Sequence, residues 1–152
     1  MHHKVIEENV RRYSNVNTRD HILRNLYDGY YNCWGFTACM VGWIDYLDWI
    51  RENQMTSYLL RYTEAVEKPM NGDIAVYVHR GYKDTWMAHR LPIRVRDEDG
   101  VLSHTAIVIN ADEGLLIQKP GGCRIGLQDF AGKLSEHNYG PIVEFRRPTT
   151  YI

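Results

Sequence analysis

Three residues of the sequence have the types and the order that nucleophilic catalysis requires: Cys33, His104 and Gln118. Cys33 lies in the segment "YYNCWGFTAC" (30–39), directly before a run with helical periodicity. The first turn of a helix offers unpaired backbone N–H groups and a partial positive charge, and both lower the pKa of a cysteine placed there. The same N–H groups can stabilise the oxyanion of an acyl-transfer intermediate. We therefore expect Cys33 to be a nucleophile, with the backbone N–H groups of Cys33 and Trp34 on the oxyanion side.

A nucleophilic thiol also needs a base, and the base needs an orienting group. His104 opens the strand-like run "HTAIVI", where alternation places His104, Ala106 and Asn110 on one face. If Asn110 pairs with Gly114 in an antiparallel hairpin, Gln118 lies opposite Ala106 and diagonal to His104, within hydrogen-bonding reach. A bulge or a one-residue slip would break this geometry. His104 is thus the expected base, and Gln118 the residue expected to orient it.

Each of these residues also has a plainer interpretation. Taken alone, Cys33 would be interpreted as a small buried apolar residue, and the nucleophile interpretation depends on the two residues that follow it in order. His104 alone fits a hydrogen-bonded histidine at a strand end. Gln118 fits a structural amide nearly as well as a catalytic one.

The elements that must hold these residues are predicted in two groups. A helical pattern covers 18–27, with Asn17 or Thr18 as N-cap, and a longer amphipathic helix is predicted from Cys33 to about Arg51; residues 56–66 fit either a short helix or a strand. Beyond Pro69, short runs bounded by turn residues predict strands at 72–78, 92–96, 104–109, 114–118 and 141–145, a hairpin turn at 97–100 and a brief helical turn at 127–134. Helices followed by an antiparallel meander indicate an α+β fold, with the N-terminal helices packed on the sheet.

Composition limits the number of domains, the partners and the compartment that we expect for this protein. The 152 residues fit a single domain, 1–152, and a formal net charge of -1 gives no electrostatic reason to expect nucleic acid as a partner. No apolar run approaches the roughly 18 residues of a membrane span, and residues 1–15 lack the apolar segment of a signal peptide, so we expect no membrane partner. Three cysteines without a CxxC or zinc-ligand spacing predict a reducing compartment and no metal site.

The ordered set of motifs carries a resemblance to a family. It comprises "NCWGF", "NGDIAVYV", "HTAIVI", "LIQKPGG" and "EFRRP", and it spans about 27–148. In this order the motifs resemble those of the NlpC-type cysteine peptidases, a cell-wall amidase superfamily related to papain. The resemblance implies a papain-like α+β fold and cleavage of an amide bond through a thioester by Cys33, His104 and Gln118. It implies no metal or organic cofactor, and a peptidoglycan stem peptide as substrate.

The sequence departs from the family pattern at several positions. Asn32 and Trp34 replace the commoner Asp and Ser beside the cysteine, and Gln is less usual than His as third residue. The family's tyrosine-containing segment is shortened to "YDGYY", which leaves three candidates for a hydroxyl on the oxyanion or substrate side: Tyr27, Tyr30 and Tyr31. An insert at about 80–103, which contains Trp86 and His89, is expected to reshape the substrate groove.

The sequence leaves open how the protein would reach its substrate and what that substrate is. A bare domain without a signal peptide is expected to be cytoplasmic when synthesised and to reach a cell wall as a virion component or a secreted effector. One rival is a cytosolic thiol amidase or acyltransferase of the same fold that acts on a substrate outside the cell wall. The other rival is a catalytically idle domain that binds a protein partner through the 80–103 insert.

Overall fold

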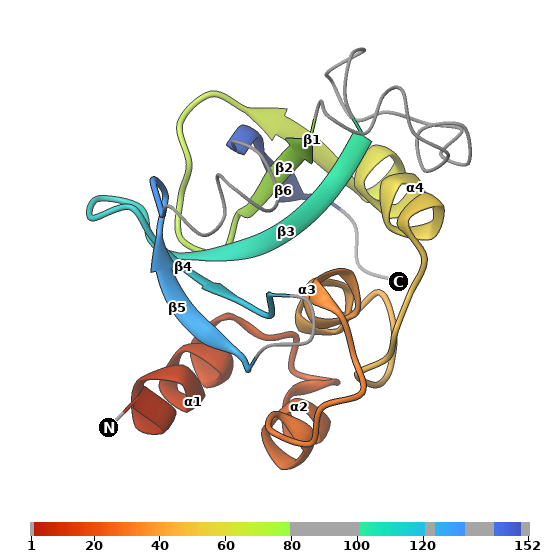
Figure 1. Ribbon diagram of the computed structural model, residues 1–152, viewed down its shortest axis with the longest axis vertical. Coiled ribbons are helices and arrows are strands. Elements are labelled where there is room, and N and C mark those ends of the chain that lie inside the picture. Colours follow the sequence, from red (N-terminus) through yellow and green to blue (C-terminus); the bar gives the residue numbers. More distant parts are fainter. Residues whose placement is uncertain (1, 80–100, 121–123, 133–141, 150–152) are drawn as a thin grey trace.

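The computed structural model describes residues 2–79, 101–120, 124–132 and 142–149 (Figure 1). The predicted strand at 92–96, the hairpin turn at 97–100 and almost all of the 80–103 insert lie outside these described residues, as does Cys123. The helices are α1 (His2–Tyr13), α2 (Arg19–Asn25), α3 (Cys33–Val41) and α4 (Glu52–Tyr62). The strands are β1 (Thr63–Val66), β2 (Ile74–His79), β3 (Val101–Asn110), β4 (Leu115–Gln118), β5 (Gly126–Asp129) and β6 (Ile142–Pro148).

The fold is α+β, as predicted from the order of the elements. The six strands form one sheet in the order β1-β6-β2-β3-β4-β5, and all neighbours are antiparallel. The expected meander is therefore interrupted, because β6 lies between β1 and β2. Helices α1, α2 and α3 gather on one side of the sheet, and α4 lies beside the end of β3 at which residue 101 begins (Figure 1).

Two apolar clusters hold the layers together, one on each face of the sheet. The first lies between the helices and the sheet and includes Phe36, Met40, Ile74, Val76 and Ile107. The second lies on the other face and contains Ala75, Tyr77, Ala106, Val108 and Leu116. Because β2 and β3 contribute alternate residues to the two clusters, both strands are buried on both faces, which explains their nearly continuous apolar sequence.

Helix α3 is shorter than predicted. It ends at Val41, because Gly42 takes up a left-handed conformation (φ 86°) and its N–H bonds to the carbonyls of Ala38 and Cys39. The chain that follows returns along the helix and reaches its start, where Asp48 lies against Gly35. The apolar residues of 43–51 instead join the core between the helices and the sheet, with the Trp43 ring against Tyr58 and Tyr62 of α4. The prediction of a helix to about Arg51 is therefore wrong.

Two further expectations are settled by the structure. The ambiguous segment 56–66 divides into the end of α4 and the whole of β1. The predicted helical turn at 127–134 is wrong at its start, because 126–129 form β5 and pair with β4.

Among the described residues, no helix has the length and apolar character that a membrane-spanning helix needs.

Candidate functional site

Helix α3 begins at Cys33, as predicted, and Asn32 is its N-cap. The Asn32 side chain accepts a hydrogen bond from the Gly35 N–H (2.8 Å), which satisfies one of the unpaired donors of the first turn. Its amide nitrogen donates to the Ile50 carbonyl (2.8 Å). An aspartate here would keep the first bond and lose the second, since a carboxylate has no donor. The amide of Asn32 thus ties the start of α3 to the chain that returns from its end.

Gly35 allows that close return. A Cβ built at this position would lie 1.7 Å from the Asp48 carbonyl oxygen, a distance that no side chain can occupy. The glycine of "NCWGF" is therefore explained by backbone packing against the segment that leads into α4.

The Cys33 thiol is almost completely enclosed, with a relative exposure of 6%. Backbone N–H groups of Thr105, Trp34 and Cys33 itself and the charge of Lys119 all act to lower the pKa of the thiol. Burial is the larger effect and raises the pKa from 9.0 to about 12. The expected net lowering is therefore wrong for the resting site, because loss of hydration outweighs the helix N-terminus. The resting thiol is protonated.

His104 and Gln118 lie together as predicted. His104 Nε2 lies 2.7 Å from Gln118 Oε1, and both side chains are buried. The register that brings them together holds at two pairs, Ile107 with Ile117 and Val108 with Leu116. It shifts next to the turn, where Asn110 lies opposite Leu115 rather than the expected Gly114. The irregularity lies on the turn side of these pairs, so it leaves the histidine–glutamine contact intact.

A second amide, that of Gln128, determines the tautomer of the histidine. Gln118 Nε2 donates to Gln128 Oε1, so Gln118 Oε1 is the acceptor for His104 Nε2–H. In the neutral ring the proton then sits on Nε2, and Nδ1 carries the lone pair that a base needs. Burial lowers the pKa of His104 from 6.5 to about 4, and the Gln118 bond opposes this only in part. The resting imidazole is neutral.

The thiol and the imidazole approach strand β3 from different sides. Thr105 faces α3, since its hydroxyl lies 2.9 Å from Thr37 Oγ1 and 3.5 Å from the Cys33 carbonyl oxygen. His104 is on the alternate face, with its ring centroid 5.0 Å from that of Tyr77. The backbone N–H of Thr105, on β3, acts on the thiol, so Cys33 Sγ lies close to this strand.

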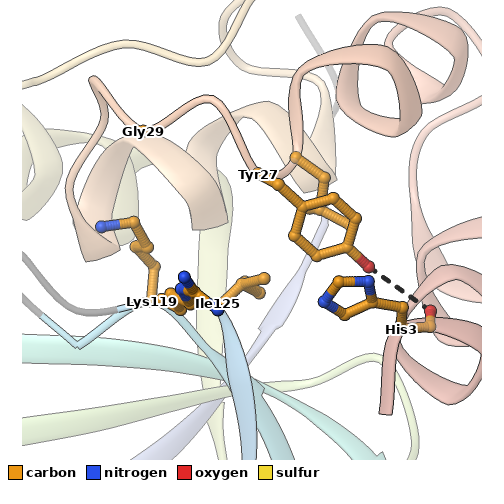
Figure 2. A pocket seen from close by; sticks show the side chains of 7 residues that line it. His3, Tyr27, Gly29, Lys119 and Ile125 are labelled. Atoms are coloured by element: carbon orange, nitrogen blue, oxygen red, sulfur yellow. Dashed lines mark hydrogen bonds between the residues drawn. The ribbon is translucent and has the colours of Figure 1, made fainter. Parts of the chain in front are cut away.

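The three candidate tyrosines have different surroundings. Tyr31 is buried, and its hydroxyl donates to the Leu26 carbonyl. Tyr30 is 93% exposed. Tyr27 stacks on His3 at 4.2 Å between ring centroids, and its hydroxyl lies 3.4 Å from the His3 carbonyl oxygen (Figure 2). The hydroxyl of Tyr31 is thus directed at the backbone of the preceding turn, and Tyr27 is the candidate that lines a cavity beside the site.

Sequence reasoning missed two residues of this site. Lys119 was not among the candidate residues, yet it is only 4% exposed, and its ammonium lies 5.2 Å from the centre of the Tyr31 ring. Gln128 fell in the segment predicted as a helical turn. Lys119 could have been found from its position directly after Gln118. Gln128 could not, because its nearness to Gln118 depends on the pairing of Gln118 with Gly126 in β5, which only the structure shows.

The described part of the chain contains no group of three or more histidine, cysteine, aspartate or glutamate side chains placed to hold a metal ion. Comparisons with protein-family models, with curated protein sequences and with solved structures gave no match for this chain.

Proposed function

We propose that the chain is a cysteine-dependent hydrolase that cleaves an amide bond through a thioester, in a papain-like domain of the NlpC type. The observation that supports this best is the buried His104–Gln118 hydrogen bond on the strand whose backbone acts on the Cys33 thiol. A nucleophile, a base and a group that orients the base are the three parts that this chemistry needs. Here they come from α3, β3 and β4.

The mechanism starts from a neutral pair, because burial keeps the thiol protonated and the imidazole uncharged. Cys33 Sγ attacks the carbonyl carbon while its proton passes to His104 Nδ1. The backbone N–H groups of Cys33 and Trp34 stabilise the oxyanion. As the ring becomes charged, its Nε2–H bond to Gln118 strengthens. His104 then gives the proton to the leaving amine, and water hydrolyses the thioester with His104 as base.

The proposed substrate is a peptidoglycan stem peptide, and the support for it is the resemblance of the ordered motifs to those of the wall peptidases. On this proposal the protein reaches the wall as a virion component or a secreted effector. The same site chemistry suits a cytosolic amidase or acyltransferase that acts on another amide, and activity on small acyl amides but not on muropeptides would favour that rival.

One observation favours the idle binding domain. Cys33 is 6% exposed and His104 is not exposed at all, so substrate must displace a covering group to reach either. The partner surface suggested for that rival, the 80–103 insert, lies almost wholly outside the described residues. Retention of the biological effect in Cys33→Ala, without any hydrolysis by the wild type, would favour this rival.

The test is digestion of muropeptides, followed by mass spectrometry. Cys33→Ala should abolish cleavage, and His104→Ala should lower kcat/KM by roughly 100- to 10,000-fold, the usual range for loss of a general base. Gln118→Ala should cause a smaller loss, chiefly in kcat. Cys39→Ala changes the other described cysteine, buried on the same helix, and should remain active. Cleavage that persists in Cys33→Ala would contradict the mechanism.

A further inference from the structure

Another cavity, of about 440 Å³, lies at the end of α3 that is opposite to Cys33. Its wall is formed by the last residues of α3 and of α1, by the turn that leads into β2 and by the end of β6. Of the described residues that line it, none belongs to the candidate active site. A volume of this size lies within the range of sites for small molecules. The cavity is therefore a second candidate site, separate from the first.

Arg147 is held in a fixed orientation at the wall of this cavity. Its Nε and Nη2 atoms each donate to one carboxylate oxygen of Asp73, at 2.9 Å, and the Asp73 side chain is only 3% exposed. A guanidinium bound along this edge keeps its other fork, with one N–H from each Nη atom, for a second oxyanion. The Arg147 side chain is 36% exposed, so a ligand can reach that fork.

Asn71 presents a further donor from the turn before β2. Its Oδ1 accepts a hydrogen bond from the Ala111 N–H (2.7 Å). Because a backbone N–H must meet the oxygen of the amide, this bond determines which end of the side chain is the nitrogen. The exposed Asn71 lines the cavity, and its Nδ2 has no hydrogen-bond partner among the described residues.

The charge of the cavity is positive. The described residues that line it include two arginines, Arg12 and Arg147, and a single carboxylate, that of Asp73. Both oxygens of Asp73 are already bound by Arg147, and one of them also accepts from the Met70 N–H (2.7 Å). The pair of Asp73 and Arg147 is neutral, so the exposed Arg12 adds a net positive charge.

The same cavity has an apolar part. Met40 and Val41 line it from the end of α3, and Met70, which is 59% exposed, lines it from the turn. A bare inorganic anion would leave these side chains without a contact. An organic molecule that carries an anionic group would use both parts of the wall.

We infer that this cavity binds the phosphate group of a small organic molecule, with Arg12, Asn71 and Arg147 as donors. A phosphate monoester has three acceptor oxygens and a charge of about -2, whereas a carboxylate has two oxygens and one charge. Donors from three separate segments therefore suit a phosphate better. The organic part of the ligand lies against Met40 and Met70. The inference goes beyond the proposed hydrolase and does not depend on it.

The experiment is a titration of the ¹⁵N-labelled protein with phenyl phosphate, followed by NMR at constant ionic strength. The reporters are the side-chain amide of Asn71 and the Nε–H groups of Arg12 and Arg147. We expect shifts of these signals that saturate. Inorganic phosphate should bind more weakly because it lacks the apolar part, and benzoate should bind more weakly because it has fewer acceptors and less charge.

Variants test the donors one at a time. Asn71→Asp keeps the acceptor for Ala111 but replaces the donor by a negative charge, so the Kd for phenyl phosphate should rise at least about tenfold. Arg12→Gln should raise it roughly fivefold, the effect typical of one exposed ion pair. Arg11→Gln is the matched control, since Arg11 is exposed on the same last turn of α1 and does not line the cavity. It should leave the Kd nearly unchanged.

Three results would overturn the inference. The first is the absence of saturating shifts at Asn71 and Arg147. The second is equal weakening by Arg11→Gln and Arg12→Gln, which would indicate general attraction to a basic surface. The third is binding of benzoate as tight as that of phenyl phosphate, which would refute the assignment to phosphate. The dispersion of signals in the same spectra shows whether each variant is folded.

Discussion

Two buried groups should make the stability of this protein depend on pH in opposite directions. Glu52, the first residue of α4, is 5% exposed and accepts a hydrogen bond from Thr56 (2.8 Å). Burial raises its pKa from 4.5 to about 7, with the Thr56 bond opposing. Burial lowers the pKa of His104 from 6.5 to about 4. The folded chain therefore prefers both groups uncharged.

The signs follow from proton binding. Between pH 4.5 and 7 the folded chain holds a proton on Glu52 that the unfolded chain releases, so this group lowers the free energy of unfolding as pH rises. Between pH 6.5 and 4 the unfolded chain binds a proton at His104 that the folded chain does not, so that group lowers stability as pH falls. For each group, the difference between its folded and unfolded pKa values changes the free energy of unfolding by about 3 kcal/mol across that pH range. In the wild type the two effects largely cancel near pH 5 to 6.

Single variants should reveal each effect. Glu52→Gln keeps the acceptor for Thr56 and removes the charge, so its stability relative to wild type should rise by about 3 kcal/mol between pH 4.5 and 7.5. His104→Gln should gain a similar amount relative to wild type as pH falls from 6.5 to 4. Urea unfolding at a series of pH values measures both. The quantity of interest is how the difference in the free energy of unfolding between variant and wild type changes with pH. A cost of the substitution that does not depend on pH therefore cancels.

The result that would refute this reasoning is a difference between variant and wild type that stays constant, within about 0.5 kcal/mol, across the whole range. The group concerned would then titrate alike in the folded and unfolded chains. For His104, such a result would mean that burial does not lower the pKa of its imidazole in the folded chain.

The start of α3 should be sensitive to substitution. Asn32→Ala loses the cap to Gly35 and leaves the buried Ile50 carbonyl without its donor, so unfolding in urea should require about 2–4 kcal/mol less. Asn32→Ser keeps a capping oxygen and should lose less; equal losses would contradict the role of the cap. Gly35→Ala should cost about 3 kcal/mol or more, because its Cβ would lie 1.7 Å from the Asp48 carbonyl oxygen. Gly29→Ala, with open space around its Cβ, should cost only about 1–2 kcal/mol, and equal costs at the two glycines would argue against close packing at Gly35.

Local patterns in the sequence predicted the placement of the candidate residues. The start of α3 at Cys33 follows from the Asn32 cap and the apolar run behind it, both of which act within one turn. The contact between His104 and Gln118 follows from alternation and the pairing of adjacent strands, which relate residues only 14 positions apart. Such features depend on residues that are close together in the chain, so they can be predicted from a single sequence.

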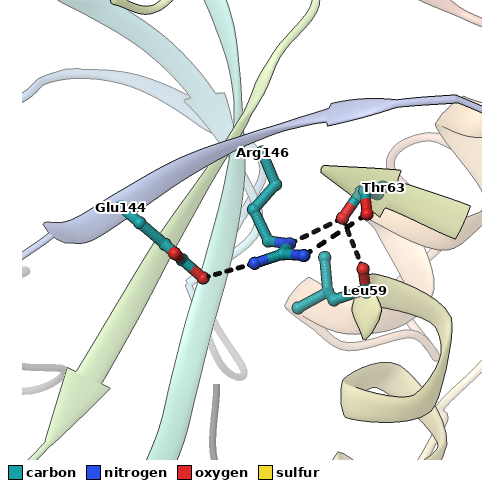
Figure 3. Close-up of polar contacts among 4 residues, drawn as sticks. All are labelled: Leu59, Thr63, Glu144 and Arg146. Atoms are coloured by element: carbon teal, nitrogen blue, oxygen red, sulfur yellow. Dashed lines mark hydrogen bonds and ion pairs between the residues drawn. The ribbon is translucent and has the colours of Figure 1, made fainter. Parts of the chain in front are cut away.

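The end of α3 and the position of β6 in the sheet were predicted wrongly, because both depend on contacts with residues far away in the sequence. The apolar residues of 43–51 have helical spacing but lie in an irregular segment that packs into the main core, and the helix ends before them at the left-handed Gly42. At the junction of β6 with β1, two side chains 83 residues apart meet: Arg146 donates to Thr63 (2.6 Å) (Figure 3). Arg146 also donates to Glu144 within β6 (2.8 Å), and Thr63 donates to the Leu59 carbonyl. No local pattern in β6 indicates this order.

The sequence by itself determined which residues start the helix, which alternate on the strands and which two side chains meet across the β3–β4 hairpin. Only the tertiary structure decided the charge states of Cys33 and His104 and the position of Lys119 beside the thiol. The physical reason is that hydrogen bonds at a cap or in a hairpin form between neighbours in the chain. Desolvation depends on every element that packs around a group, and here it outweighs the local helix field that predicted a low pKa for Cys33.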